Sequence, residues 1–121
     1  MVLGLLAGPA IAQANAETVV RVTGFLGDLR FSAADVRADL MGTDPATRQI
    51  AIAMNEDATA AFTLFTTTHV NQSVTLFICG QQIQPVTVQA PIDSGFVLSD
   101  AIPLDIATAM VAALNGEGDC P

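Results

Sequence analysis

Apolar and polar residues follow two periodicities along this chain, and these predict its elements. Strict alternation predicts strands at 18–23, 48–54, 73–79 and 81–90, with shorter ones at 29–31 and 96–99. Helical spacing predicts a helix over 56–70 after Asn55 as N-cap, and a last helix from Pro103 to Asn115. The segment 32–42 fits a helix or a strand equally well. Short turns join these elements, which predicts an α+β fold: a largely antiparallel sheet with two helices packed on one face.

The hairpin over 73–90 has two irregular positions. Gly80 supplies the positive φ that a tight turn needs, but turn geometry gives no reason for Cys79 before it, where Asp or Asn is usual. The apolar parity of the return strand changes near Pro85. A bulge at that point would explain both the change of parity and the tolerated proline.

Residues 1–16 have the pattern of a secretory signal peptide. The apolar run Val2–Ala12 ends in two overlapping small-x-small sites, which predict cleavage after Ala14 or Ala16. The run is shorter than the roughly 20 apolar residues that span a bilayer. A buried N-terminal helix is the alternative, although two glycines and a proline interrupt the run. We expect residues 17–121 to form one domain, periplasmic or secreted, without stable membrane insertion after cleavage, or tethered only by an uncleaved leader.

The two cysteines, Cys79 and Cys120, form an even pair in a presumed oxidising compartment. We expect a disulfide that fastens the C-terminal tail to the tip of the hairpin. Two free thiols are the alternative. A zinc site has too few soft ligands, because neither cysteine lies in a CxxC motif and the chain has a single histidine.

Charge limits the classes of partner. The chain has 121 residues, and its twelve acidic residues against four arginines give a formal charge of −8. Such a surface repels phosphate backbones, so nucleic acid is not an expected partner. An acidic membrane surface is not an expected partner for the same reason. Solubility alone is the simplest explanation of the acidic composition.

No group of residues predicts catalysis. His69 lies on the apolar face at a helix end, where a core or capping residue is expected. Glu56 and Asp57 fit the positive end of the helix dipole, and Asp35 and Asp39 fit a solvated face. We therefore predict no catalytic residue, no cofactor and no metal site, and no enzyme activity.

The order and spacing of the motifs resemble one family, the head subdomain of the first periplasmic domain of SecD/SecDF. The similarity runs from Phe31 to Leu114, and its most specific part is the hairpin Gly80–Pro85 followed by Pro-Ile-x-x-Gly at 91–95. Cys79 departs from the pattern, because the family mostly has Asp there. The matching stretches are DVRADL, RQIAIAM, AAFTLFTTTHVNQ, VTLFICGQQIQPVTV, PIDSGFVLS and PLDIATAMVAAL.

The resemblance implies a role in binding rather than in chemistry. In that family the head is thought to contact the emerging preprotein, so we expect a module that binds extended polypeptide in the cell envelope. The loop and strand around Ile92 and Phe96 are the expected contact residues. A structural or regulatory envelope protein that docks on one folded partner is the alternative, and an enzyme is a distant third.

Overall fold

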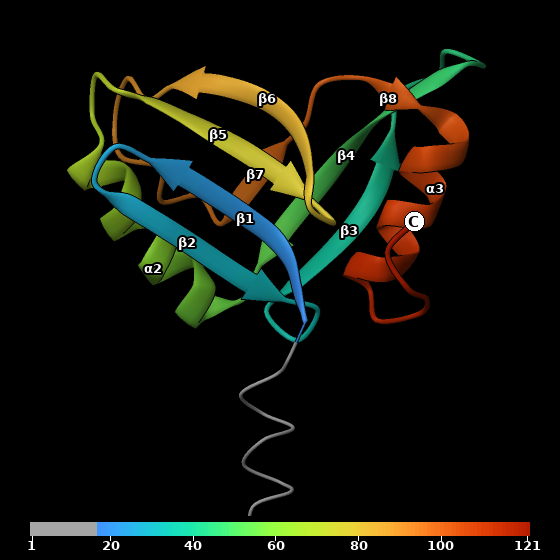
Figure 1. Ribbon diagram of the computed structural model, residues 1–121, viewed down its shortest axis with the longest axis horizontal. Helices are drawn as coiled ribbons and strands as arrows, with labels where there is room; N and C mark the ends of the chain where they lie inside the picture. The colour runs from blue at the N-terminus through green and yellow to red at the C-terminus, as the bar shows by residue number, and fades with distance from the viewer. Residues whose placement is uncertain (1–16) are drawn as a thin grey trace, which may run out of the picture.

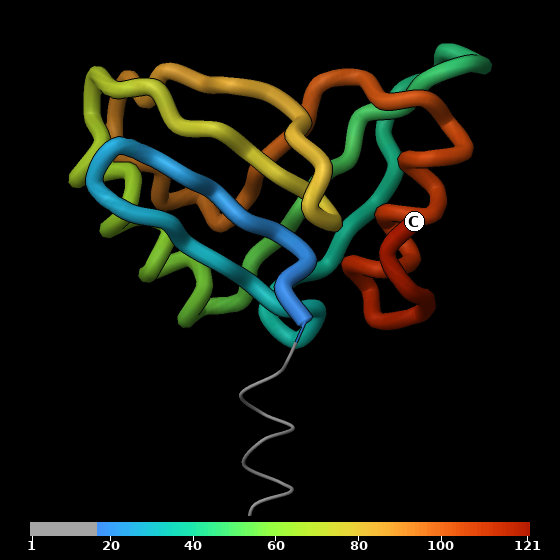
Figure 2. Tube along the Cα trace, viewed as in Figure 1, coloured from blue at the N-terminus to red at the C-terminus, as the bar shows by residue number. Residues whose placement is uncertain are grey.

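The computed structural model describes residues 17–121 (Figures 1 and 2). The predicted leader, residues 1–16, lies outside the described residues. In chain order, the elements are β1 (Thr18–Gly24), β2 (Gly27–Ser32), β3 (Val36–Met41), β4 (Thr47–Met54), α2 (Glu56–Thr68), β5 (Ser73–Ile78), β6 (Gln81–Thr87), β7 (Phe96–Leu98), β8 (Ile102–Pro103) and α3 (Leu104–Leu114). The ambiguous segment 32–42 is therefore mainly a strand.

The strands form two antiparallel sheets, and with the two helices they confirm the α+β class. One sheet has the order β2-β1-β5-β6, and the other has the order β3-β4-β7, with β8 pairing to β4. We expected a single sheet with both helices on one face. Instead, α2 packs on β2 and β4, while α3 packs mainly on β3 and β4 at the other end of the molecule (Figure 1). The strands divide into two sheets because β1 pairs with β5, which is distant in sequence, whereas β3 pairs with its neighbour β4.

The core joins both sheets and both helices in one apolar cluster. Met110 and Leu114 of α3 are fully buried, as are Ile50 of β4 and Ile78 of β5. Full burial of one such side chain contributes about 1.5–3 kcal/mol. The apolar stripe of the last helix therefore fixes α3 against the second sheet.

Both ends of α2 agree closely with the sequence. The Asn55 side chain accepts a hydrogen bond from the Ala58 amide at 2.8 Å, which confirms the N-cap. The helix ends at Thr68, two residues before the expected end at Val70, and His69 is its C-cap. β-branched threonines in the last turn weaken the helix there.

The β5–β6 hairpin turns through two residues in the left-handed region, Cys79 with φ 53° and Gly80 with φ 77°. Cys79 is bonded to Cys120, and their Cα atoms lie 5.4 Å apart, so the expected disulfide is confirmed. The bulge lies at Ile83 rather than at Pro85, because the pairing shifts on either side of that residue. Pro85 needs no bulge, since β6 is an edge strand.

The C-terminal end of α3 closes the free edge of β3. The helix begins at Leu104, one residue after the expected Pro103, and Asn115 is its C-cap. The Asn115 side-chain amide accepts from the Ala38 amide at 2.8 Å and donates to the Ala38 carbonyl at 2.9 Å. This side chain takes the place of a neighbouring strand, so the edge of β3 is blocked at this residue.

Candidate functional site

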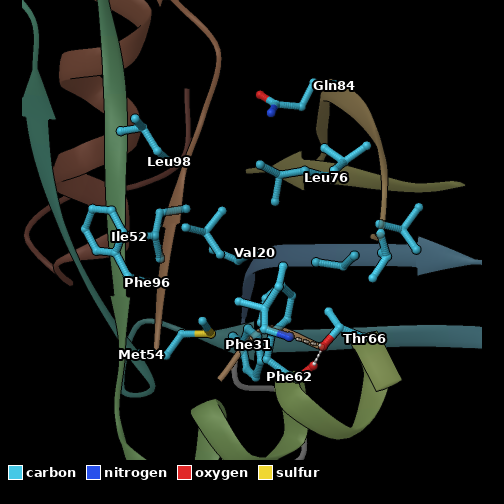
Figure 3. Close-up of a pocket in the computed structure, with 16 residues that line it drawn as sticks. Val20, Phe31, Ile52, Met54, Phe62, Thr66, Leu76, Gln84, Phe96 and Leu98 are labelled. Atoms are coloured by element: carbon cyan, nitrogen blue, oxygen red, sulfur yellow. Dashed lines mark hydrogen bonds between the residues drawn. The ribbon is translucent and has the colours of Figure 1, made fainter. Parts of the chain in front are cut away.

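The two predicted contact residues, Ile92 and Phe96, line one cavity of about 270 Å³ between the sheets (Figure 3). Its walls come from both sheets, from α2 and from the loop before β7. The lining residues are Val20, Val22, Phe31, Ile52, Met54, Phe62, Thr66, Val74, Leu76, Gln84, Val86, Val88, Ile92, Phe96, Val97 and Leu98. We call this space the cleft.

The cleft is open to solvent along an apolar rim. Val86 of β6 is 38% exposed, and Phe96 and Leu98 of β7 are 47% and 41% exposed. Strands β6 and β7 are each the last strand of their sheet, so the rim joins two sheet edges. Apolar side chains at this exposure are available to a second molecule.

Two threonines of α2 hold the loop that carries Ile92. The Thr66 hydroxyl accepts from the Ile92 amide at 2.9 Å, and the Thr63 hydroxyl donates to the Ile92 carbonyl at 2.9 Å. Thr66 is 1% exposed and also donates to the Phe62 carbonyl at 3.0 Å. The main chain of Ile92 is thus fixed on both sides, which places its side chain at the wall of the cleft.

Gly95 allows the same loop to approach α2 before β7 begins. A Cβ atom at this position would lie 2.8 Å from the Thr59 hydroxyl, and the φ of Gly95 is 74°. Its carbonyl accepts from the Met54 amide at 2.9 Å, which ties it to the end of β4. Glycine is therefore required for this loop to pack as it does.

Both polar side chains of the cleft, Gln84 and Thr66, make hydrogen bonds within the protein. Gln84 of β6 accepts from the Asp100 amide through its side-chain oxygen, which links β6 to the segment after β7. Thr66 is satisfied as described, and no residue of the lining is charged. Such a surface binds apolar groups by burial, and it presents no group for proton transfer or nucleophilic attack.

His69 lies outside the cleft, in a structural position. The ring is 1% exposed, its Nδ1 donates to the Phe65 carbonyl at 2.8 Å, and its Nε2 accepts from the Leu26 amide at 3.2 Å. The ring also stacks on Phe65, with centroids 4.2 Å apart. The core or capping role expected from the sequence is therefore confirmed. Within residues 17–121 no cluster of three or more His, Cys, Asp or Glu side chains is arranged to hold a metal ion.

Sequence reasoning missed the threonines that support the cleft. Thr59, Thr63 and Thr66 lie at helical spacing on one side of α2, and each contributes a hydroxyl to the packing of the loop. The sequence offered a signal, because threonine is a poor helix former and needs a reason to recur on one face. The loop over 91–95, which these threonines support, is distant from them in sequence, so the sequence did not show what they contact.

The same fold is found in solved structures of SecDF. The chain superposes on a structure described as SecDF, a membrane component that enhances protein export, with a TM-score of 0.67 and 11% identity, covering 100% of this chain and 72% of that one. It also superposes on SecDF in its super-membrane-facing form, with a TM-score of 0.59 and 15% identity over 77% of this chain. The resemblance to SecD/SecDF is thus confirmed at the level of the fold.

The chain corresponds to 12% of the length of SecDF in the super-membrane-facing form. No protein-family model and no curated protein sequence matches it. Neither helix in the part of the chain from Glu17 onward is long and apolar enough to cross a membrane.

Proposed function

We propose that this protein is a binding module of the cell envelope that holds short extended apolar segments of polypeptide in the cleft. The observation that carries the proposal is an uncharged cavity of about 270 Å³ with an exposed apolar rim. Protein interiors are close-packed, so an apolar space of this size between two sheets needs an explanation. Its volume suits one or two apolar side chains rather than a large cofactor.

An extended segment fits the geometry better than a helix. The rim runs along two strand edges, β6 and β7, each of which pairs on one side only. A strand laid against such an edge gains main-chain hydrogen bonds and points alternate side chains in one direction. Those side chains would enter the cleft beside Phe96, while the intervening ones face solvent.

The location outside the cytoplasm belongs to the same proposal. The leader pattern at residues 1–16, the disulfide and the likeness of fold to an export component all support an exported protein. On this proposal, residues 17–121 are the mature domain. The same proposal assigns the protein no enzyme activity, and the supporting role of both polar side chains of the cleft favours it.

A pair of matched variants tests the proposal. Phe96 and Met41 are each 47% exposed on a strand, but only Phe96 lines the cleft. The binding of a fluorescein-labelled peptide of alternating valine and threonine is measured by anisotropy. We expect affinity in the micromolar range. Phe96→Ser should weaken it by about 45-fold, because roughly 90 Å² of ring surface is no longer available for burial, at about 25 cal/mol per Å².

A control variant and a charged peptide test whether binding depends on the cleft and on apolar side chains. Met41→Ser should leave the affinity unchanged, and a peptide with aspartate in place of valine should not bind, because its charges would be buried in an uncharged cavity. Equal affinity of the Phe96→Ser and Met41→Ser proteins would refute the cleft as the binding site.

A further inference from the structure

The turn between β1 and β2 presents two large apolar side chains to solvent. Gly24 pairs with Gly27, so Phe25 and Leu26 alone form the turn, and they are 86% and 57% exposed. Turn positions normally carry Gly, Asn, Asp or Ser. Neither residue lines the cleft, and Phe25 contributes little to the core. We call these two residues the tip.

The tip is held in place by a buried side chain. The Leu26 amide donates to Nε2 of His69, which is the C-cap of α2. A Cβ atom on Gly24 would lie 2.5 Å from both Cδ2 and Nε2 of the same ring, so only glycine allows this close approach. An apolar tip that is already ordered loses little conformational entropy on binding, which favours a specific contact.

The charge around the tip differs from that of the whole protein. Two arginines and one aspartate give the hairpin, residues 18–32, a formal charge of +1, whereas the chain carries −8. Arg30 donates to Asp28 at 3.0 Å, and Arg21 lies 3.5 Å from the same carboxylate. These contacts, that with Arg30 first, hold the pKa of Asp28 below its usual value.

The elements beside the tip contribute no charge of their own. Residues 58–92, which include the end of α2 and the start of β5, contain no Asp, Glu, Lys or Arg. Val74 of β5 pairs with Gly24, so this uncharged surface reaches the tip. The hairpin therefore offers an apolar point flanked by a small excess of positive charge.

We propose that Phe25 and Leu26 insert into an apolar pocket, with an acidic rim, on a second, folded protein of the envelope. An acidic rim would complement the charges of Arg21 and Arg30, whose side chains are 41% and 59% exposed. Aromatic residues, phenylalanine included, are enriched in the buried centre of protein interfaces. The interface is separate from the cleft, so it does not depend on the peptide-binding proposal.

Two other occupants fit the same observations less well. A lipid surface needs no ordered turn, and an anionic membrane would repel a protein of charge −8. A second copy of the chain would bring the same negative charge and the same repulsion. Both are measured as outcomes of the test.

The experiment first identifies the partner by crosslinking and then measures its affinity. The photoreactive residue p-benzoylphenylalanine replaces Phe25, or Met41 as a control, in the native host, and the protein crosslinked only through position 25 is identified and purified. Its affinity is then measured for the wild-type protein and for the Phe25→Ser, Arg30→Gln and Met41→Ser variants. Vesicles of phosphatidylethanolamine and phosphatidylglycerol, and sedimentation of the protein alone, test the other occupants.

We expect Phe25→Ser to weaken binding of the purified partner by about 30-fold, the size of an interface hot spot. Arg30→Gln should reduce the dependence of the affinity on salt, and Met41→Ser should change nothing. All three variants should melt as the wild type does, because the replaced side chains are exposed. The proposal is overturned if Phe25→Ser leaves the partner's affinity unchanged. It is also overturned if the tip residues are needed for vesicle binding or self-association instead.

Discussion

Breaking the bond between Cys79 and Cys120 should lower the stability of the protein by a large amount, part of which depends on the residue that replaces Cys79. The two residues are 41 positions apart, and closing a loop of that length restricts the unfolded chain by about 4 kcal/mol on the chain-entropy model. Cys120→Ser should show this full loss. For a domain of this size it corresponds to a fall in melting temperature of about 15 °C.

Replacing the other cysteine also changes the turn. Cys79 has a φ of 53°, a region that costs an ordinary side chain about 1–2 kcal/mol and suits asparagine better. Cys79→Ser should therefore resemble Cys120→Ser, whereas Cys79→Asn should recover about 1 kcal/mol, because Asn-Gly is a preferred two-residue turn. Urea unfolding without reductant measures all three variants.

Two results would refute this reasoning. If Cys120→Ser unfolds at the wild-type urea concentration, the bridge does not constrain the unfolded chain. If Cys79→Asn is no more stable than Cys79→Ser, the left-handed turn is not a source of strain. Reduction of the wild-type protein is the control, and it should give the same loss as Cys120→Ser.

Three further substitutions test single contacts by urea unfolding. Asn115→Ala should cost about 2 kcal/mol, because it removes both hydrogen bonds to Ala38. Gly24→Ala should cost about 1–3 kcal/mol, because its methyl group would overlap His69, whereas Gly118→Ala should be tolerated. Thr66→Val should cost about 1–3 kcal/mol by leaving a loop amide unpaired, and an unchanged stability would contradict the support assigned to that hydroxyl.

Local elements followed from the sequence because local patterns determine them. The N-cap at Asn55 and the alternation through β4 and β5 each depend on residues that are close in the chain. The bond between Cys79 and Cys120 was also predictable, since only one pairing of two cysteines exists. The motif order that indicated SecD/SecDF is likewise a sequence property.

The arrangement of the sheets and the cleft did not follow, because both depend on contacts between distant segments. β1 pairs with β5, although β2, β3, β4 and α2 lie between them in the chain. No local pattern encodes that pairing. Ile92 and Phe96 were placed by resemblance alone, and their role in lining a cavity depends on Thr63 and Thr66 of α2. The exposure of Phe25 at the turn between β1 and β2 was not predicted.

Chemical-shift mapping of a bound peptide tests the central claim most directly. The amide spectrum of the protein is recorded while a peptide of alternating valine and threonine is added to high excess. The cleft predicts saturable shifts at Val86, Phe96 and Leu98 and at the loop around Ile92, with little change along α3. A spectrum that stays unshifted, or shifts that gather on α3 instead, would contradict the account.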